Sequence, residues 1–276
     1  MEKLFGLIGE KLGHTYSPLI HKKIMEEINI KGHYGSFQVE RENLKDIVPG
    51  LKALGYKGIN VTIPYKRDII KYLDYLSPEA EKIGAVNVVD IDKDGRAGGY
   101  NTDYHGFGMM LDDACMNIRG ESALILGTGG AAKAVAQYLK DNGINRLIFL
   151  TRDTVAAKEK FPEDQVLPYD NFKTIKNCST IINSTPVGMY PNIDDTPLDK
   201  SYFKGFYQAV DLIYNPLETV FIRQAKNQGL KGVNGLYMLV AQAVKSQEIW
   251  NGIEITENVI KNILNFLKKE DLWLKI

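Results

Sequence analysis

Hydrophobic and polar positions follow two different periods in turn along the chain, and this alternation predicts an α/β protein. Short apolar runs typical of strands, beginning with Lys3–Ile8, are separated by segments whose apolar residues fall on one helical face. Residues 17–28 and 43–54 are two such helical segments. Ser17 followed by Pro18 predicts a helix start with Ser17 as the N-cap.

The rest of the first hundred residues continues this pattern. Strands are predicted at 34–39 and 58–63, and a helix at Arg67–Leu76. Residues 87–91 and 96–100 flank Asp94-Gly95, a sequence that favours a hairpin turn. The first half of the chain is therefore expected to be an α/β domain with a hairpin at one edge.

A second α/β pattern starts after a helix predicted from Asp103 to about Met116. Residues 122–126 form a continuous apolar run of the kind that is buried on both faces of a parallel sheet. Further strands are predicted at 146–151, 165–168, 180–183, 207–212 and 230–233, with helices at 131–142 and 219–228. This βαβ alternation predicts a Rossmann-type doubly wound parallel sheet. The last two helices, 236–250 and 256–269, have no place in such a sheet and are expected to pack back onto the first domain.

Composition narrows the class of protein. At about 150 residues per domain, 276 residues suggest roughly two domains. Lys+Arg and Asp+Glu both total 34, so the chain lacks the basic excess expected of a nucleic-acid-binding protein. No apolar stretch approaches the roughly 20 residues of a membrane helix. Cys115 and Cys178 are far apart and outside any metal-binding spacing, which predicts two buried free thiols, no metal site and a cytoplasmic location.

A glycine-rich turn, Gly127-Thr-Gly-Gly-Ala131, directly follows the buried strand 122–126 and opens an amphipathic helix. Glycines in this context permit a tight turn and let backbone N–H groups approach a pyrophosphate at the helix N-terminus. The turn therefore predicts a dinucleotide site, although such turns also occur for packing reasons.

The next strand ends in Thr151-Arg152-Asp153, at the position that contacts the adenosine ribose. An acidic residue there binds the 2′-hydroxyl of NAD, whereas an arginine accommodates the 2′-phosphate of NADP. Arg152 favours NADP, and Asp153 would repel a phosphate if it faced the same way. A purely solvated loop pair is the third interpretation.

Polar residues also gather at the predicted strand ends of the first domain, where open α/β sheets bind ligands. They are Thr15, Ser17, Thr62, Lys66, Asn87 and the segment Asn101-Thr-Asp103. Hydroxyls, amides, one lysine and one aspartate suit a small, hydroxyl-rich anionic ligand. Each residue alone also has a structural explanation, such as a helix cap for Ser17, Thr102 or Asp103 and a surface charge for Lys66.

Eight segments in order resemble motifs of the shikimate dehydrogenase family, and they span nearly the whole chain. Gly58-Ile-Asn-Val-Thr-Ile-Pro-Tyr-Lys66 matches the family's most diagnostic motif. The other segments are 8–21, 84–87, 99–106, 127–131, 183–189, 211–216 and 235–243. Such an ordered series is far more specific than one glycine-rich loop.

This resemblance implies a role for each matching residue. Lys66 and Asp103 would form the catalytic pair that exchanges a proton with the substrate alcohol. The substrate would be bound at its carboxylate by Thr15, Ser17 and Tyr214, and at its ring hydroxyls by Thr62, Asn87, Asp103 and Gln242. The cofactor would be bound at its pyrophosphate by Gly127, Thr128, Gly129, Gly130 and Ala131, at its 2′-phosphate end by Thr151 and Arg152, and at its nicotinamide end by Thr185, Gly235 and Met238.

The resemblance also implies an activity and a domain order. The activity is the reversible NADPH-dependent reduction of 3-dehydroshikimate to shikimate, in aromatic amino acid biosynthesis, by a monomer or homodimer. The substrate-binding catalytic domain would comprise 1–103 and 237–276, with the NADP-binding domain, 104–236, inserted between them. Two alternatives stay open: a quinate/shikimate dehydrogenase that uses NAD, because Asp153 follows Arg152, and a non-catalytic nucleotide-binding sensor. The presence of both Lys66 and Asp103 argues against the sensor.

Overall fold

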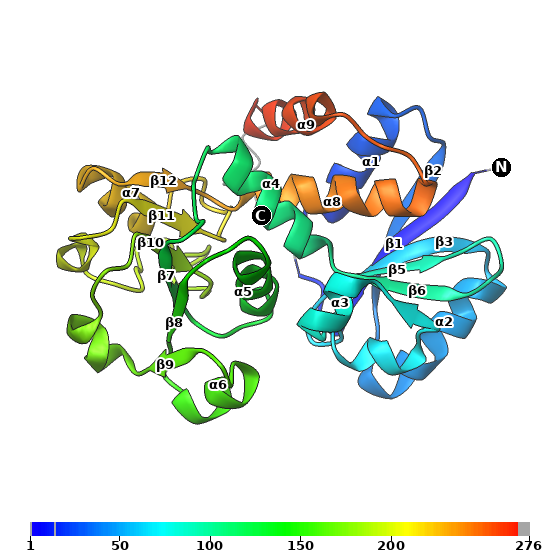
Figure 1. The fold of residues 1–276 in the computed structure, drawn as a ribbon. Coiled ribbons are helices and arrows are strands. Elements are labelled where there is room, and N and C mark those ends of the chain that lie inside the picture. Colours follow the sequence, from blue (N-terminus) through cyan, green and yellow to red (C-terminus); the bar gives the residue numbers. More distant parts are fainter. Residues whose placement is uncertain (1, 14, 270–276) are drawn as a thin grey trace. The chain divides into compact units, whose positions relative to one another are not determined.

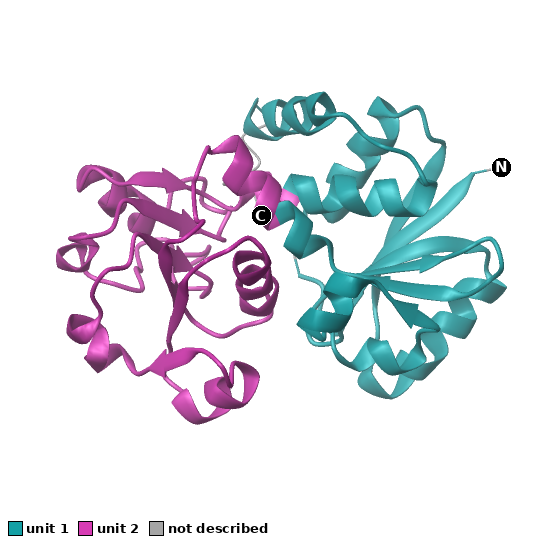
Figure 2. Ribbon diagram, viewed as in Figure 1, with its two compact units in different colours: residues 1–106, 240–270, 276 teal, residues 107–239, 271–275 magenta. Residues whose placement is uncertain are grey.

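The protein folds into two compact units, seen in a computed structural model that describes residues 2–13 and 15–269. Within these residues, unit 1 comprises 2–106 and 240–269, and unit 2 comprises 107–239 (Figure 2). The chain passes between the units within helix α4 (Thr102–Asp113) and again within helix α8 (Leu236–Asn251). His14 of the first motif and residues 270–276, which the sequence assigns to the substrate domain, lie outside the described residues.

Unit 1 is built on a mixed six-stranded sheet (Figure 1). In spatial order its strands are β2 (Gly32–Gln38), β1 (Lys3–Gly9), β3 (Tyr56–Val61), β5 (Val88–Ile91), β6 (Ala97–Tyr100) and β4 (Tyr75–Leu76). β1 pairs in parallel with β2 and β3, whereas β5 pairs antiparallel with β3 and β6. Therefore the carboxyl ends of β1, β3 and β6 and the amino end of β5 lie at one edge of the sheet. That edge is where the polar segments predicted to bind substrate begin.

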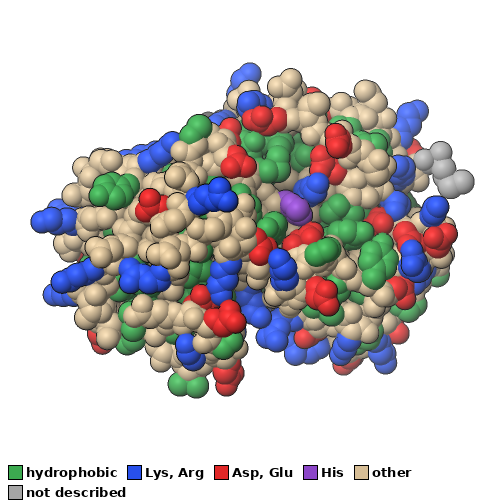
Figure 3. Space-filling view, in the orientation of Figure 1, with side chains coloured by type: hydrophobic (Ala, Val, Ile, Leu, Met, Phe, Trp, Pro, Cys, Tyr) green, Lys and Arg blue, Asp and Glu red, His purple; other side chains and the backbone are tan. Residues whose placement is uncertain are grey.

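Helices cover both faces of this sheet. The helices of unit 1 are α1 (Ser17–Glu27), η1 (Arg41–Asn43), α2 (Leu44–Ala53), η2 (Asp68–Tyr72), α3 (Pro78–Ile83), α9 (Glu257–Lys269), the first part of α4 and the second part of α8. One hydrophobic cluster includes Phe5, Met25 and Trp250, and the other includes Ile8 and Val48. On the face of unit 1 shown in Figure 3, charged side chains of both signs are interspersed, in keeping with a net charge of zero.

The predicted return of the C-terminal helices to the first domain is confirmed. α9 contacts α1, and the fully buried Trp250 of α8 lies over β3. Its indole Nε1 donates a hydrogen bond of 3.0 Å to the carbonyl of Val89. A Cβ added at Gly58 would lie 2.0 Å from that indole nitrogen, so only glycine admits the tryptophan there.

Unit 2 is the predicted doubly wound parallel sheet. In spatial order its strands are β12 (Lys231–Val233), β11 (Gln208–Asp211), β10 (Thr180–Asn183), β7 (Ser122–Leu126), β8 (Arg146–Leu150) and β9 (Gln165–Leu167), and all neighbours are parallel. Its helices, besides the second part of α4, are α5 (Ala132–Asp141), α6 (Thr154–Lys160), η3 (Tyr169–Thr174), η4 (Lys200–Phe203) and α7 (Val220–Asn227). The strand order reverses between β7 and β10, which is where such sheets bind ligands.

Two local predictions are wrong. Arg67–Leu76 is not one helix, because only residues 68–72 are helical and Tyr75–Leu76 form strand β4. Ser17 is not the N-cap of α1: Tyr16 holds that position, and the backbone N–H of Ser17 donates 3.2 Å to Thr15 Oγ1.

The cysteine prediction is half right, since both thiols are free but only Cys178 is buried and Cys115 is exposed. Among residues 2–13 and 15–269, no helix has the length and apolar character to cross a membrane. The same residues contain no cluster of three or more His, Cys, Asp or Glu side chains suited to a metal ion.

Candidate active site

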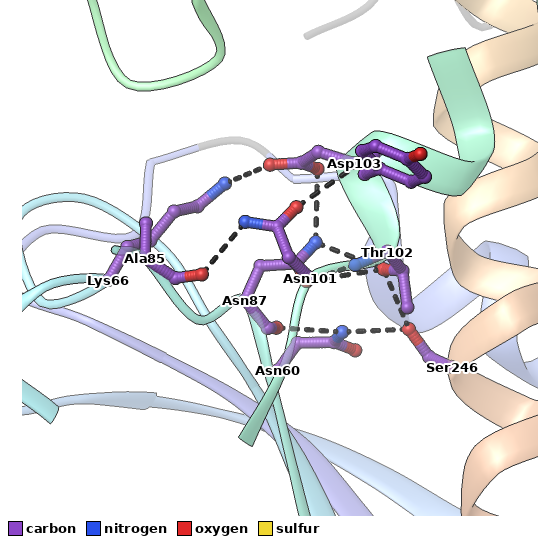
Figure 4. A network of polar contacts seen from close by, with 9 residues as sticks. Asn60, Lys66, Ala85, Asn87, Asn101, Thr102, Asp103 and Ser246 are labelled. Carbon is purple, nitrogen blue, oxygen red and sulfur yellow. Dashed lines mark hydrogen bonds and ion pairs between the residues drawn. The ribbon is translucent and has the colours of Figure 1, made fainter. Parts of the chain in front are cut away.

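A lysine–aspartate ion pair lies at the strand-end edge of unit 1 (Figure 4). Lys66 follows β3, and Asp103 is in the first turn of α4 directly after β6. Lys66 Nζ lies 2.6 Å from Asp103 Oδ2, and the two side chains are 19% and 13% exposed. The predicted pair is thus in direct contact and largely shielded, yet open enough to meet a small ligand.

Asn87 orients the aspartate from the side opposite the lysine. Its Nδ2 donates hydrogen bonds of 3.0 Å to Asp103 Oδ1 and of 3.0 Å to the hydroxyl of Thr102. Its Oδ1 accepts a hydrogen bond of 2.7 Å from the backbone N–H of Thr102. Asn87 is only 4% exposed, so its amide has a fixed direction. Asn101 caps the helix instead of Thr102 or Asp103, because its Oδ1 accepts 3.3 Å from the Tyr104 N–H.

A buried polar layer behind Asn87 was not singled out by the sequence. Asn60 Nδ2 donates 3.3 Å to the Asn87 carbonyl and 3.1 Å to the hydroxyl of Ser246 on α8. The Ser246 hydroxyl lies 3.4 Å from that of Thr102 and donates 2.9 Å to the carbonyl of Gln242. The layer joins β3, the start of α4 and α8, and so it fixes the backbone that carries the pair. Asn60 stood within the diagnostic motif, whereas no local pattern marked Ser246.

The other residues expected to bind substrate in unit 1 occupy the same edge or helix α8. Thr15 and Ser17 contact each other through their hydroxyls at 3.2 Å. Thr62 directly follows β3, and its N–H donates 2.9 Å to the carbonyl of Ile8 on β1. Gln242 lies on α8, one turn before Ser246. All four side chains of the set are partly buried.

The glycine-rich turn of unit 2 borders a pocket of about 630 Å³. The pocket is lined by Gly127, Thr128, Gly129, Thr151, Arg152, Tyr169, Ser184, Thr185, Pro186, Val187, Thr196 and Pro197. Gly127 has φ +85°, a conformation that favours glycine, and a Cβ there would lie 2.7 Å from Thr185 Cγ2. Helix α5 then begins after Ala131 with no side-chain cap. A helix that starts in this way, directly after a glycine-rich turn, is a common place for an anion to bind.

Asn183, which is hydrogen-bonded to Asp211, orients Thr185 in the pocket lining. Asn183 Oδ1 accepts from the Thr185 backbone N–H at 3.0 Å and from its hydroxyl at 2.7 Å. Asn183 Nδ2 in turn donates 3.0 Å to Asp211, which also accepts from Thr219 at 2.6 Å. Burial raises the pKa of Asp211 to about 7. These contacts hold the segment after β10 in the position from which it lines the pocket.

Arg152 and Asp153 have separate surroundings. Asp153 is the N-cap of α6, and its Oδ1 accepts 3.0 Å from the Ala156 N–H. Arg152 is exposed and lines the pocket. The aspartate is therefore engaged by a helix N-terminus, whereas Arg152 belongs to the lining of the pocket.

The remaining predicted residues of unit 2 lie outside that pocket lining. A Cβ at Gly235 would lie 2.1 Å from the carbonyl oxygen of Leu212, so the backbone itself requires this glycine. Met238 is 8% exposed on the first turn of α8. Burial raises the pKa of Tyr214, which belongs to unit 2, whereas Thr15 and Ser17 belong to unit 1. The roles assigned to these residues stay predictions, as do those of Gly130 and Ala131.

The protein combines two features. Unit 2 is a Rossmann-type unit with an uncapped helix start after a glycine-rich turn, and unit 1 is an α/β unit that bears a shielded Lys–Asp pair. This combination is typical of a nucleotide-dependent dehydrogenase. Comparisons with known proteins agree. Residues 7–89 match the family model described as "Shikimate dehydrogenase substrate binding domain". A shikimate dehydrogenase (NADP(+)) from Clostridium perfringens is 48% identical over 268 residues, which cover 96% of this chain and 98% of the relative.

Solved structures give the same result. A chorismate mutase/shikimate 5-dehydrogenase fusion protein from Clostridium acetobutylicum has a TM-score of 0.94 at 46% identity, over 98% of each chain. The shikimate 5-dehydrogenase from Thermus thermophilus, in complex with NADP(H) and shikimate, has a TM-score of 0.83 at 31% identity, over 96% of this chain and 99% of the other. The chain belongs to the shikimate dehydrogenase family.

Proposed function

We propose that the protein catalyses the reversible NADP-dependent reduction of 3-dehydroshikimate to shikimate. Unit 1 binds the acid, and unit 2 binds the dinucleotide. The observation that carries this proposal is the Lys66–Asp103 pair at 2.6 Å, held by Asn87 at the strand-end edge. Family membership supports the reaction and the cofactor, since the curated relative described above carries the name shikimate dehydrogenase (NADP(+)).

The chemistry requires one hydride and one proton. NADPH bound to unit 2 would supply the hydride that the carbonyl carbon of 3-dehydroshikimate accepts. Lys66 in its ammonium form donates a hydrogen bond to the carbonyl oxygen, stabilises the negative charge that develops there, and gives up the proton that completes the alcohol. In the oxidative direction neutral Lys66 takes that proton back.

Asp103 and the neighbouring polar groups position this step. The Asp103 carboxylate holds the Lys66 ammonium at 2.6 Å and has remaining lone pairs to accept from a substrate hydroxyl. Asn87 fixes the carboxylate plane, so the lysine amine has one favoured direction. Thr15 and Ser17 offer two adjacent hydroxyls to the substrate carboxylate.

The residues of unit 2 fit a dinucleotide phosphate. Helix α5 starts without a side-chain cap at Ala131, and the backbone at Gly129 just before it is open, since a Cβ there would meet only Ser184 O at 3.8 Å. Arg152 on the pocket wall supports recognition of a 2′-phosphate, and the neighbouring Asp153 accepts a hydrogen bond as the cap of α6.

The direct test is a four-way assay. Purified protein is mixed with shikimate or quinate and with NADP⁺ or NAD⁺, and formation of reduced nicotinamide is followed by absorbance. We expect the highest kcat/KM for shikimate with NADP⁺. A preference for quinate and NAD⁺ would instead identify a quinate/shikimate dehydrogenase. Absence of turnover in all four mixtures, with dinucleotide binding retained, would identify a non-catalytic sensor.

A further inference from the structure

A lysine at the far end of α6 reaches the glycine-rich turn. Lys160 is the last residue of α6, and its Nζ donates 3.3 Å to the backbone carbonyl of Thr128. Thr128 lines the same pocket as Arg152, which stands just before α6. Of the two cations, Arg152 thus lines the pocket, and Lys160 contacts a residue of its lining from the other end of α6.

Charge around this pocket explains why a second cation matters. Arg152 and Asp153 are adjacent and exposed, and their charges cancel in sum. A 2′-phosphate carries about two negative charges near neutral pH, so one guanidinium beside a carboxylate leaves it incompletely compensated. Lys160 adds one positive charge at the turn. The Thr128 carbonyl engages only one of its three N–H donors, so the others can meet an anion.

We propose that Lys160 is a specificity-determining residue, which binds the cofactor's 2′-phosphate together with Arg152 and so favours NADP over NAD. The inference rests on the proposed function, since it concerns the cofactor of that same site. Its contribution concerns discrimination and not the hydride transfer itself, because NAD lacks the group that Lys160 would bind.

Lys158 offers a matched control on the same helix. It is also an exposed lysine of the last turn, but its Nζ donates 2.9 Å to the carbonyl of Asp164 and not to the glycine-rich turn. Lys158→Ala therefore removes the same charge from α6 without removing a contact to the pocket lining.

The experiment measures binding of NADP⁺, NAD⁺, 2′,5′-ADP and ADP by calorimetry to the wild type, Lys160→Ala, Lys160→Arg and Lys158→Ala. We expect Lys160→Ala to weaken the binding of NADP⁺ and 2′,5′-ADP by roughly 5- to 10-fold. The dissociation constants of NAD⁺ and ADP should stay within about twofold of the wild-type values. Both Lys160→Arg and Lys158→Ala should keep the wild-type preference for NADP⁺ over NAD⁺.

Two results would overturn the role of Lys160. An equal loss of affinity for NADP⁺ and NAD⁺ would assign it to the pyrophosphate or to the turn itself, and unchanged affinities for both dinucleotides would assign it no role. By contrast, a wild-type protein that binds neither dinucleotide would contradict the proposed function. The two failures are therefore distinguishable.

Discussion

Replacement of Lys66 by alanine tests the proposed chemistry most directly. The variant loses the ammonium that lies 2.6 Å from Asp103. A positioned general acid contributes roughly 10²- to 10⁴-fold to rate, or about 3–5 kcal/mol at 1.36 kcal/mol per decade. We expect kcat for shikimate oxidation to fall by that factor. The dissociation constant of NADP⁺ should stay within about twofold, because the lining of the unit 2 pocket comes from residues between 127 and 197.

The variant should also remain folded. Loss of one partner of a fully buried ion pair lowers the free energy of unfolding by about 3–5 kcal/mol, because the other charge is left without compensation. Asp103 is 13% exposed and keeps its hydrogen bond of 3.0 Å from Asn87, so we expect a smaller cost of about 1–2 kcal/mol. A domain of ordinary stability tolerates that loss.

Lys57→Ala is the matched control. Lys57 also lies 2.6 Å from a carboxylate, that of Asp90, but near the amino end of β3, away from the proposed site. It should lower the urea midpoint as Lys66→Ala does and leave kcat unchanged. Steady-state kinetics and calorimetry on both variants decide the matter: turnover of Lys66→Ala within about threefold of the wild type would refute the assigned role.

Three further predictions concern other parts of the molecule. Arg152→Leu should raise the KM for NADP⁺ by roughly 10- to 100-fold and change that for NAD⁺ little, as dinucleotide titrations of the rate would show, since a charged hydrogen bond is worth about 1.5–3 kcal/mol. Glu79 accepts from His105 at 3.2 Å, which lowers the pKa of Glu79 from 4.5 to about 2, so its stabilisation is present above pH 4.5 and lost as pH falls toward 2. Urea unfolding of Glu79→Gln and the wild type should therefore converge over that range, and a constant difference would contradict the assignment. Gly235→Ala should lower the melting temperature of the protein by several degrees, because its Cβ would meet the Leu212 carbonyl, and an unchanged melting curve would show that the backbone yields freely.

Periodicity predicted most of the fold because each element carries its own local signal. Residues 123–126 are apolar, as expected of a strand buried on both faces, and together with Ser122 they form the central strand β7. The exception was Arg67–Leu76, whose spacing suits a helix. Tyr75 instead pairs with β6, where Gly98 leaves room for its ring: a Cβ at Gly98 would lie 2.4 Å from Tyr75 Cζ. This segment pairs with Gly98 and Gly99, which lie more than twenty residues further along the chain, so the local sequence pattern could not predict the strand.

The candidate site, too, was predicted from the sequence only in part. Lys66, Asn87 and Asp103 were predicted because they follow or precede strands that meet at one edge. Ser246 was missed because its partner, Asn60, is 186 residues away and an isolated serine on a helix carries no signal. The position of Asp153 as a helix cap likewise needed coordinates, since the sequence left its direction open.

The packing of Trp250 against Gly58 gives unit 1 an optical reporter of its own. The chain has two tryptophans, Trp250 and Trp273, and neither falls within residues 107–239. In a Trp273→Phe background, emission comes from an indole that is fully buried between α8 and the sheet of unit 1. Its red shift during denaturation follows that unit alone, whereas circular dichroism follows both. The separation between the two curves then measures how far unit 1 and unit 2 melt independently.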